Sequence, residues 1–182
     1  EGADSLGFTT AGAERLGISA TVAAVQQGSV AFSTSNARLG GLIKSDMVDV
    51  VVTDGTAQDL ITYSLAANSL SVDGQSIKFV MMGTFAGNAN SKTITANFGA
   101  TTLVTSGAAL FNGADWTIEG TCVRTSATAQ ECLTKILTSS SLLPVTVDFT
   151  EPAETLSGAV TLKATGDGGA ASDIVQEGLL VY

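Results

Sequence analysis

Carboxylates form the densest group of potentially catalytic side chains in this sequence. Asp148, Glu151 and Glu154 lie close together in the segment DFTEPAET. A glycosidase needs two such groups, one to act as the acid and one to act as the base or nucleophile. The segment lies at the end of a predicted strand and contains a proline, so we expect it to form a loop. Solvated acidic residues are ordinary in such loops. We interpret the three residues as structural, with a carboxylate-based polysaccharide depolymerase as the less favoured alternative.

Other catalytic and metal chemistry has little support in the residue types. The sequence contains no histidine, which removes Ser-His and Cys-His nucleophile activation and the commonest zinc ligand. Asp167 and Asp173 in TGDGGAASD could offer oxygen ligands to calcium, but their spacing matches no EF-hand loop, and Asp-Gly is ordinary turn chemistry. We therefore expect no catalytic, cofactor-binding or metal-binding residue, and no enzyme activity.

The two cysteines have a spacing that a β-hairpin would bring together. If residues 116–125 and 130–138 pair around Ala127, positions whose numbers sum to 254 face each other, and Cys122 and Cys132 satisfy this sum. Opposed Cβ atoms lie about 4.5–5.5 Å apart in an antiparallel pair, slightly longer than a relaxed disulfide prefers. The sequence thus predicts cross-strand neighbours and leaves open both a strained disulfide and two small buried thiols.

Charge and hydropathy exclude two classes of partner. The chain of 182 residues has a net charge of −9, and its eight Lys and Arg residues are scattered singly. A nucleic-acid-binding protein needs a concentrated basic surface, which is absent here. The apolar runs VDVVV and FVMM are far shorter than the ~18 residues that span a bilayer, so we expect no membrane insertion. The chain begins at Glu1 without a signal-peptide pattern, and we expect these residues to belong to a longer polypeptide.

The remaining pattern is that of an all-β protein. Short runs rich in β-branched residues are separated by Gly, Asn, Asp or Ser clusters, namely SIKFVMM, KTITANF, DWTIEGTCVRT, QECLTKILT, PVTVDF, AVTLKAT and IVQEGLLVY. Such spacing favours a sandwich or jelly roll. Trp116, Ile118, Gly120 and Cys122 alternate with mostly polar residues, which predicts one buried face and places Trp116 in the core. No residue can therefore be assigned to sugar stacking.

The chain divides into two parts near GGLIKSD. Residues 1–45 contain many glycines and a loose apolar pattern, whereas residues 46–182 carry the regular succession of strands. We interpret the segment ATVAAVQQGSVAF at 20–32 as a linker, because its apolar residues follow neither a helical nor a strand period.

The segment GADSLGFTTAGAERLGIS at 2–19 resembles the short repeat of tailed-bacteriophage fibres, in which L-x-F-[ST]-x-x-G-x-E-R-L-x-I forms a small hairpin in a trimeric shaft. The chain keeps Leu6, Phe8, Thr9, Gly12, Glu14, Arg15, Leu16 and Ile18, and has Gly17 where a polar residue is common. A hairpin turning at Gly12 would place four apolar residues on one face, namely Leu6, Phe8, Leu16 and Ile18. A lone hairpin is marginally stable, so such a unit needs neighbours from other chains.

A second resemblance covers roughly residues 59–182. The segments LITYSLAANSLSVDGQSIKFVMMGTFAGNANSKTITANFGATTLV, NGADWTIEGTCVRTSATAQ and SDIVQEGLLVY are similar to the jelly-roll domains of phage virion surface proteins, namely tail fibres, head fibres and capsid decoration proteins. The resemblance implies a homotrimeric structural protein on the virion surface, assembled in the host cytoplasm with other capsid or tail proteins. It also implies a reducing compartment during assembly, which favours free thiols at Cys122 and Cys132.

The resemblance implies two roles. A fibre or spike head would serve host attachment by binding a cell-surface glycan or protein, and a capsid decoration protein would act as cement for the head. Jelly-roll loops can vary without disturbing the paired strands, which makes them the candidate contacts. The loops expected at one end or the other are 84–92, 107–115, 139–144 and 165–172, all rich in Gly, Ala, Asn and Ser. We expect a parallel homotrimer, with residues 1–45 in intertwined contacts.

Overall fold

The computed structural model describes residues 5–10, 13–19, 41–143 and 145–182. The chain forms two compact units, Glu1–Leu39 and Gly40–Tyr182. The division falls before the predicted boundary at residue 45, because Lys44–Asp46 is already a strand of the larger unit. The predicted linker at 20–32 lies outside the described residues. In the part of the chain that is described, no helix has the length and apolar character needed to cross a membrane.

The smaller unit contains an antiparallel hairpin of β1 (Ser5–Thr10) and β2 (Ala13–Ser19). The register pairs Leu6 with Ile18 and Phe8 with Leu16, in agreement with the predicted grouping of these four positions on one face, since cross-strand partners share a face. The register shifts after Phe8. The predicted turn residue, Gly12, lies outside the described residues.

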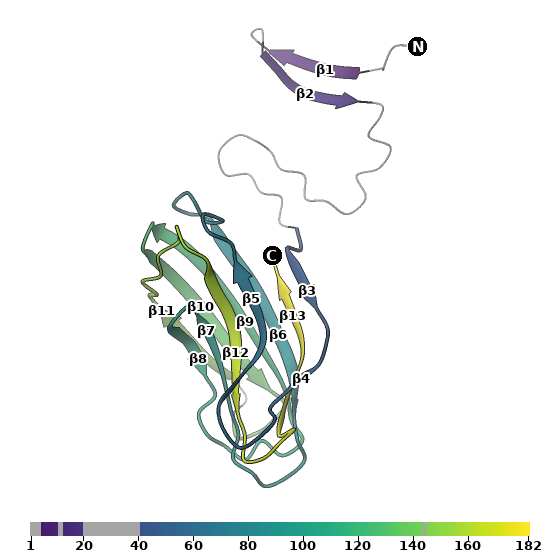
Figure 1. Ribbon diagram of the computed structural model, residues 1–182, viewed down its shortest axis with the longest axis vertical. Helices are drawn as coiled ribbons and strands as arrows, with labels where there is room; N and C mark the ends of the chain where they lie inside the picture. The colour runs from purple at the N-terminus through teal and green to yellow at the C-terminus, as the bar shows by residue number, and fades with distance from the viewer. Residues whose placement is uncertain (1–4, 11–12, 20–40, 144) are drawn as a thin grey trace. The chain divides into compact units, whose positions relative to one another are not determined.

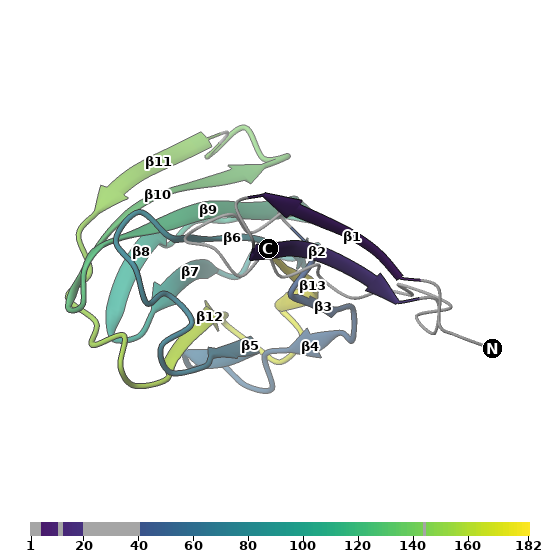
Figure 2. The ribbon, with the colours of Figure 1, turned by 90° about the horizontal axis from the view of Figure 1, so that it is seen from above.

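The larger unit is a sandwich of two antiparallel sheets (Figures 1 and 2). This confirms the predicted all-β, jelly-roll-like class. The seven-stranded sheet has the order β11 (Val145–Thr150), β10 (Ala129–Thr138), β9 (Asp115–Ser126), β6 (Ser76–Phe85), β13 (Ile174–Val181) and β3 (Lys44–Asp46), with β4 (Val50–Val51) also paired to β13. The four-stranded sheet has the order β5 (Gln58–Leu65), β12 (Val160–Asp167), β7 (Thr93–Phe98) and β8 (Thr101–Thr105).

Alternating side chains from both sheets form the core between them. Every second residue of β7 is buried, as are alternate residues of β12. Trp116, Ile118 and Cys122 of β9 are all buried, which confirms the predicted inward face of this strand. The ring of Phe85 stacks on Phe111, with 4.6 Å between centroids, and lies 6.3 Å from the ring of Trp116. Because Phe111 belongs to the connection between β8 and β9, these aromatic contacts also anchor that loop to the core.

The segment 83–103 includes the start of β8 (Thr101–Thr105), a strand that is not among the seven runs predicted from the sequence. After β6 and the loop 86–92, β7 is followed by a turn at Gly99 and Ala100 and then by β8. β8 has the sequence TTLVT, in which the two buried residues, Leu103 and Val104, are adjacent. The sequence therefore lacks the alternation of apolar and polar residues that would predict a strand.

Candidate functional site: the loop end of the sandwich

The four loops predicted as contact candidates gather at one end of the larger unit (Figure 1). They connect β6 to β7, β8 to β9, β10 to β11 and β12 to β13. The strand register brings them together, because Thr84 pairs with Asp115, Trp116 with Thr138, and Thr93 with Asp167. A fifth connection, 52–57 between β4 and β5, joins them through Ser172 N–H, which donates to Val52 O at 2.7 Å. We call residues 52–57, 86–92, 106–115, 139–143 and 165–173 the loop end.

The chain enters this unit at the opposite end of the sandwich. Lys44 of β3 pairs with Val181, the last residue of β13, whereas β13 begins at Ile174 beside the loop end. The connections between β5 and β6, β7 and β8, β9 and β10, and β11 and β12 also lie at that opposite end, because antiparallel neighbours alternate in direction. The loop end is therefore the face of the unit farthest from its attachment to the rest of the chain.

Hydrogen bonds tie neighbouring loops to one another. Lys92 and Ala109 exchange backbone hydrogen bonds of 2.9 and 3.1 Å. Asp115 N–H donates to Ser139 Oγ at 2.8 Å, and Ser139 N–H donates to Asp115 O at 3.0 Å. Gly113 N–H donates to Ala86 O at 3.2 Å. These bonds hold the loops as one surface, because each loop is anchored to at least one neighbour.

A buried carboxylate lies beneath this surface. Asp173 is 1% exposed, and its oxygens accept from Asn88 Nδ2 at 2.6 Å, Asn90 Nδ2 at 2.9 Å and Ala170 N at 2.8 Å. Burial raises the pKa of Asp173, but the bonds from Asn88, Asn90 and Ala170 and the positive charge of Lys92 outweigh burial and hold the pKa below its usual value of 3.8. The carboxylate is thus ionised and joins the 86–92 loop to the 168–173 loop.

A buried lysine completes this network. Lys92 is fully buried, and its Nζ donates to Asn88 Oδ1 at 2.8 Å, Asn90 O at 3.0 Å and Asn88 O at 3.3 Å. An ammonium removed from water needs such a set of acceptors. The 86–92 loop therefore wraps around the side chain of its own lysine.

Close packing explains one of the glycines in this network. A Cβ on Gly169 would lie 2.9 Å from Asn90 Cβ, a distance that real side chains do not tolerate. The Gly-rich sequence TGDGGAASD therefore allows the 168–173 loop to approach the 86–92 loop.

Asp167 and Asp173, which the sequence made weak candidates for a calcium site, have separate roles in the structure. Asp167 is exposed, and Asp173 receives amide donors, which are partners for a carboxylate and not for a cation. Among the described residues no group of three or more His, Cys, Asp or Glu side chains could hold a metal ion. The sequence did not predict the hydrogen bonds from Asn88 and Asn90 to Asp173, nor the positive charge of Lys92 near it. A lone lysine within an Asn-rich loop was the available signal, but nothing in the sequence placed Asp173 next to it.

The outer surface of the loop end is small, polar and acidic. Its exposed charged side chains in the described residues are Asp54, Asp115 and Asp167, because Lys92 and Asp173 are buried. Leu110 and Leu142 are its exposed large apolar side chains, and its aromatic residue Phe111 is buried. Within the described residues, the loop end thus offers hydrogen-bonding groups and negative charge, and no aromatic platform.

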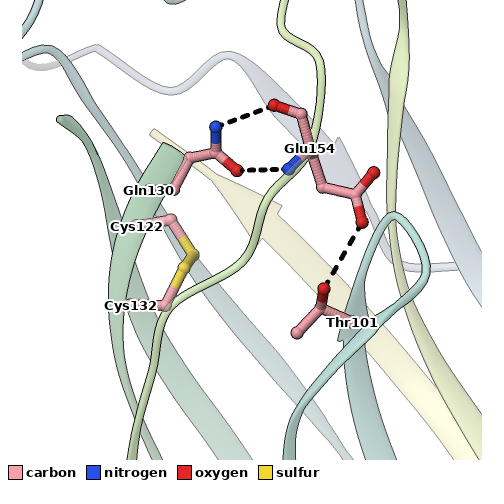
Figure 3. The surroundings of a disulfide bond; sticks show 5 residues. All are labelled: Thr101, Cys122, Gln130, Cys132 and Glu154. Carbon is pink, nitrogen blue, oxygen red and sulfur yellow. Dashed lines mark hydrogen bonds between the residues drawn. A yellow bond between two sulfur atoms is a disulfide. The ribbon is translucent and has the colours of Figure 1, made fainter. Parts of the chain in front are cut away.

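The three carboxylates of DFTEPAET lie away from the loop end. Glu154 accepts a hydrogen bond from Ala100 N at 2.8 Å and one from Thr101 Oγ1 at 3.4 Å, so its carboxylate holds the turn between β7 and β8 (Figure 3). Its backbone N–H and C=O both bond to the side chain of the buried Gln130. Glu151 is exposed, and Asp148 pairs across the sheet with Thr134. The structure therefore gives Glu154 the structural role expected of it.

The two cysteines are cross-strand neighbours, as predicted. Cys122 pairs with Cys132 in the register of β9 and β10, and their Cα atoms are 4.1 Å apart. They form a disulfide (Figure 3), so the expectation of free thiols is wrong. The physical reason is the register, because directly opposed residues of an antiparallel pair have Cα atoms about 4.5–5.5 Å apart, within reach of a disulfide.

Comparisons with known proteins add one remote likeness. No protein-family model and no curated protein matches the sequence. A solved structure, that of the CBM2 module of the evolved Dit of Lactobacillus casei BL23 phage J-1, resembles the fold with a TM-score of 0.31 and 10% identity. The match covers 72% of this chain and 74% of that chain. At this identity and TM-score, the match assigns no function to this chain.

Proposed function

We propose that this chain is a non-enzymatic structural protein of a tailed-bacteriophage virion, a homotrimeric fibre or spike head that contacts the host surface through its loop end. The observation that carries the proposal is the gathering of all four candidate loops at the end opposite the point where the chain enters the sandwich. A head that stands on a shaft needs its contact surface at the end opposite its attachment, and within the larger unit the loop end lies opposite β3, where the chain enters the sandwich.

The loop network supports a binding role in a second way. Asp173, Asn88, Asn90 and Lys92 hold two loops from below with buried hydrogen bonds. A surface held in place before binding loses less conformational entropy when it binds. Three copies of a weak site on one head, repeated over several fibres, would gain about 10²–10⁴ in avidity when the geometry permits.

The charge of the loop end limits the chemistry of its partner. Its exposed charges, within the described residues, come from Asp54, Asp115 and Asp167. A polyanionic glycan would be repelled by such a surface. We therefore propose a neutral glycan or a basic protein surface as the partner.

The test replaces small exposed residues at the two ends of the sandwich. Ala89, Ala108 and Ala171 are exposed at the loop end, and Ala67, Ala127 and Ala153 are exposed at the opposite end. We expect Ala→Arg at the first three positions, introduced together in the phage, to slow adsorption to host cells by at least about 10²-fold, the lower limit of the avidity gain. The same substitution at the second three positions is the matched control and should leave adsorption unchanged.

Other outcomes identify the alternatives. Particles that become fragile while adsorbing normally would indicate a capsid cement. Equal adsorption by both triple variants would contradict host attachment through the loop end. A polysaccharide cleavage activity that Asp148→Asn, Glu151→Gln and Glu154→Gln abolish would contradict the non-enzymatic proposal.

A further inference from the structure

The outer face of the seven-stranded sheet carries a groove that is separate from the loop end. The groove has a volume of about 440 Å³ and is lined by residues of β6, β9, β10 and β11 and by Tyr182, which follows β13. Phe79 and Thr134 line it although their side chains are buried, and Gly120, which pairs with both of them, has no side chain. The floor of the groove is therefore backbone, and its walls are the side chains of neighbouring residues.

The strand register places an aromatic ring beside a lysine at one end of this groove. Lys78 N–H donates to Tyr182 O at 3.1 Å, and Tyr182 N–H donates to Lys78 O at 2.8 Å. Directly opposed residues have side chains on the same face, with Cβ atoms about 4.5–5.5 Å apart. Tyr182 is 40% exposed, and Lys78 is exposed and has no ion-pair partner among the described residues. An accessible ring thus lies next to an unpaired positive charge.

The middle of the groove offers a hydroxyl group and an ion pair. Thr121 pairs with Lys78 in the register and is partly exposed. Two residues before it on β9, Glu119 pairs with Lys135 of β10, and Lys135 Nζ lies 3.0 Å from Glu119 Oε2. The side chains of Lys135 and Glu119 are 43% and 44% exposed, so both can also bond to a ligand. Because their charges cancel, the groove as a whole carries the one positive charge of Lys78.

Apolar side chains form the other end of the groove. Leu133 of β10 and Val147 of β11 line it and are each 56% exposed. Val147 is one of three outward-facing apolar residues of the edge strand β11, the others being Val145 and Phe149. A concave site with a ring at one end, an apolar wall at the other and a few polar groups between them has the mixed character of sites for small molecules.

We propose that this groove binds an acidic sugar, either a uronic acid or a short oligosaccharide that contains one. The apolar face of the sugar ring packs on Tyr182, and the sugar carboxylate pairs with Lys78. A neutral sugar would leave the charge of Lys78 unpaired, and a small inorganic anion would leave the ring of Tyr182 uncovered. The groove shares no residue with the loop end, whose exposed charges are acidic, so this inference does not rest on the proposed function.

The first test titrates the ¹⁵N-labelled full chain with glucuronate, and with glucose and acetate for comparison. We expect glucuronate to shift the amide resonances of Lys78, Gly120 and Tyr182, with a dissociation constant of about 1 mM, as is usual for a ligand of this size. Glucose lacks the carboxylate and acetate lacks the ring, so each should bind at least about tenfold more weakly. Acetate binding as tight as that of glucuronate would show attraction of any anion and would overturn the proposal, as would the absence of shifts at ten times the expected dissociation constant.

The second test removes the two groups that recognise the sugar. Lys78→Gln removes the charge and Tyr182→Ala removes the ring, and each should weaken glucuronate binding by at least about tenfold while the dispersion of the amide spectrum stays native. Lys163→Gln is the matched control, because Lys163 is a partly exposed lysine of the four-stranded sheet, and it should leave binding unchanged. Native affinity in either folded groove variant would contradict the assigned site. Neither test measures host adsorption, so failure of this site is distinct from failure of the attachment role.

Discussion

Single buried polar residues decide the shape of the loop end. Asp173 has its carboxylate fully occupied by amide donors, and Lys92 has its ammonium surrounded by carbonyl oxygens. A buried charge that loses its partners costs more than the hydrogen bonds themselves, because it cannot return to water. The stability of the surface above therefore depends on a few side chains that no ligand would touch.

We expect Asp173→Asn to lower the free energy of unfolding by about 2–3 kcal/mol, the usual range for buried hydrogen bonds to a charged group. The depressed pKa of Asp173 also makes native stability depend on pH. The ionised carboxylate stabilises the fold above pH ~4, and this contribution is lost as the pH falls from ~4 through the lower pKa of the folded state. Urea denaturation between pH 7 and pH 2 should show the difference between native and variant shrinking over that window.

The matched control for this prediction is Asp167→Asn. Asp167 lies six positions earlier in the chain and is exposed, so its replacement should change the free energy of unfolding by less than about 0.5 kcal/mol. An Asp173→Asn variant as stable as this control at pH 7 would contradict the role of the buried network.

At the scale of elements, one carboxylate and one glycine form the turn between β7 and β8. Gly99 has a φ of 59°, a left-handed conformation that costs a side chain about 1 kcal/mol or more. A Cβ at this position would also lie 2.1 Å from Glu154 Cδ. The turn therefore excludes a larger residue for two separate reasons, of which only one involves Glu154.

A double-mutant cycle separates these two reasons. We expect Gly99→Ala to destabilise the chain by more than 1 kcal/mol, and Glu154→Ala by about 1–3 kcal/mol because Ala100 N–H loses its acceptor. Gly99→Ala should cost less when Glu154 is already Ala, since the clash is gone and only the backbone strain remains. Equal costs in both backgrounds, measured by urea denaturation, would show that Glu154 moves aside freely.

The disulfide acts on the hairpin of β9 and β10. Cys122 and Cys132 are separated by ten residues in the sequence, so a chain-entropy estimate gives the bond about 2–3 kcal/mol of stabilisation. We expect the Cys122→Ala and Cys132→Ala double variant to remain folded with a free energy of unfolding reduced by about this amount. Alkylation of the native protein under denaturing, non-reducing conditions should label neither cysteine, and labelling of both would contradict the bond.

At the scale of the whole molecule, the two units of the chain differ in how stable each one is by itself. The larger unit has two sheets and its own core, which is enough for independent folding. The smaller unit contains a two-stranded hairpin, which is marginal by itself in water. Association between chains would therefore help the smaller unit more than the larger one.

Removal of residues 1–40 tests this difference. We expect residues 41–182 to keep the sheet content and cooperative unfolding of the full chain, and to form trimers more weakly, with a concentration-dependent mass in sedimentation velocity. An unfolded product would contradict the independence of the larger unit. A trimer as tight as that of the full chain would show that the smaller unit contributes nothing to assembly.

The sequence by itself determined the features that depend on neighbours along the chain. Alternation predicted the buried face of β9 with Trp116, and the spacing around Ala127 predicted the pairing of Cys122 with Cys132, because a hairpin register follows from a short connection. The hairpin register of Leu6 with Ile18 followed from the same kind of local pattern. The sequence was less informative for β8, because its threonines hide the alternation of apolar and polar residues that marks a strand.

Only the tertiary structure decided which distant segments meet. It placed Asp173 beside Asn88 and Asn90, more than eighty residues away, and it brought four loops to one end, which depends on the direction of every strand in two sheets. It also showed that the apolar residues of β11 face outward, because alternation gives two faces but not which face meets the core. Contacts of this kind come from strand order, and strand order is set by the packing of the whole sandwich rather than by any local run of residues.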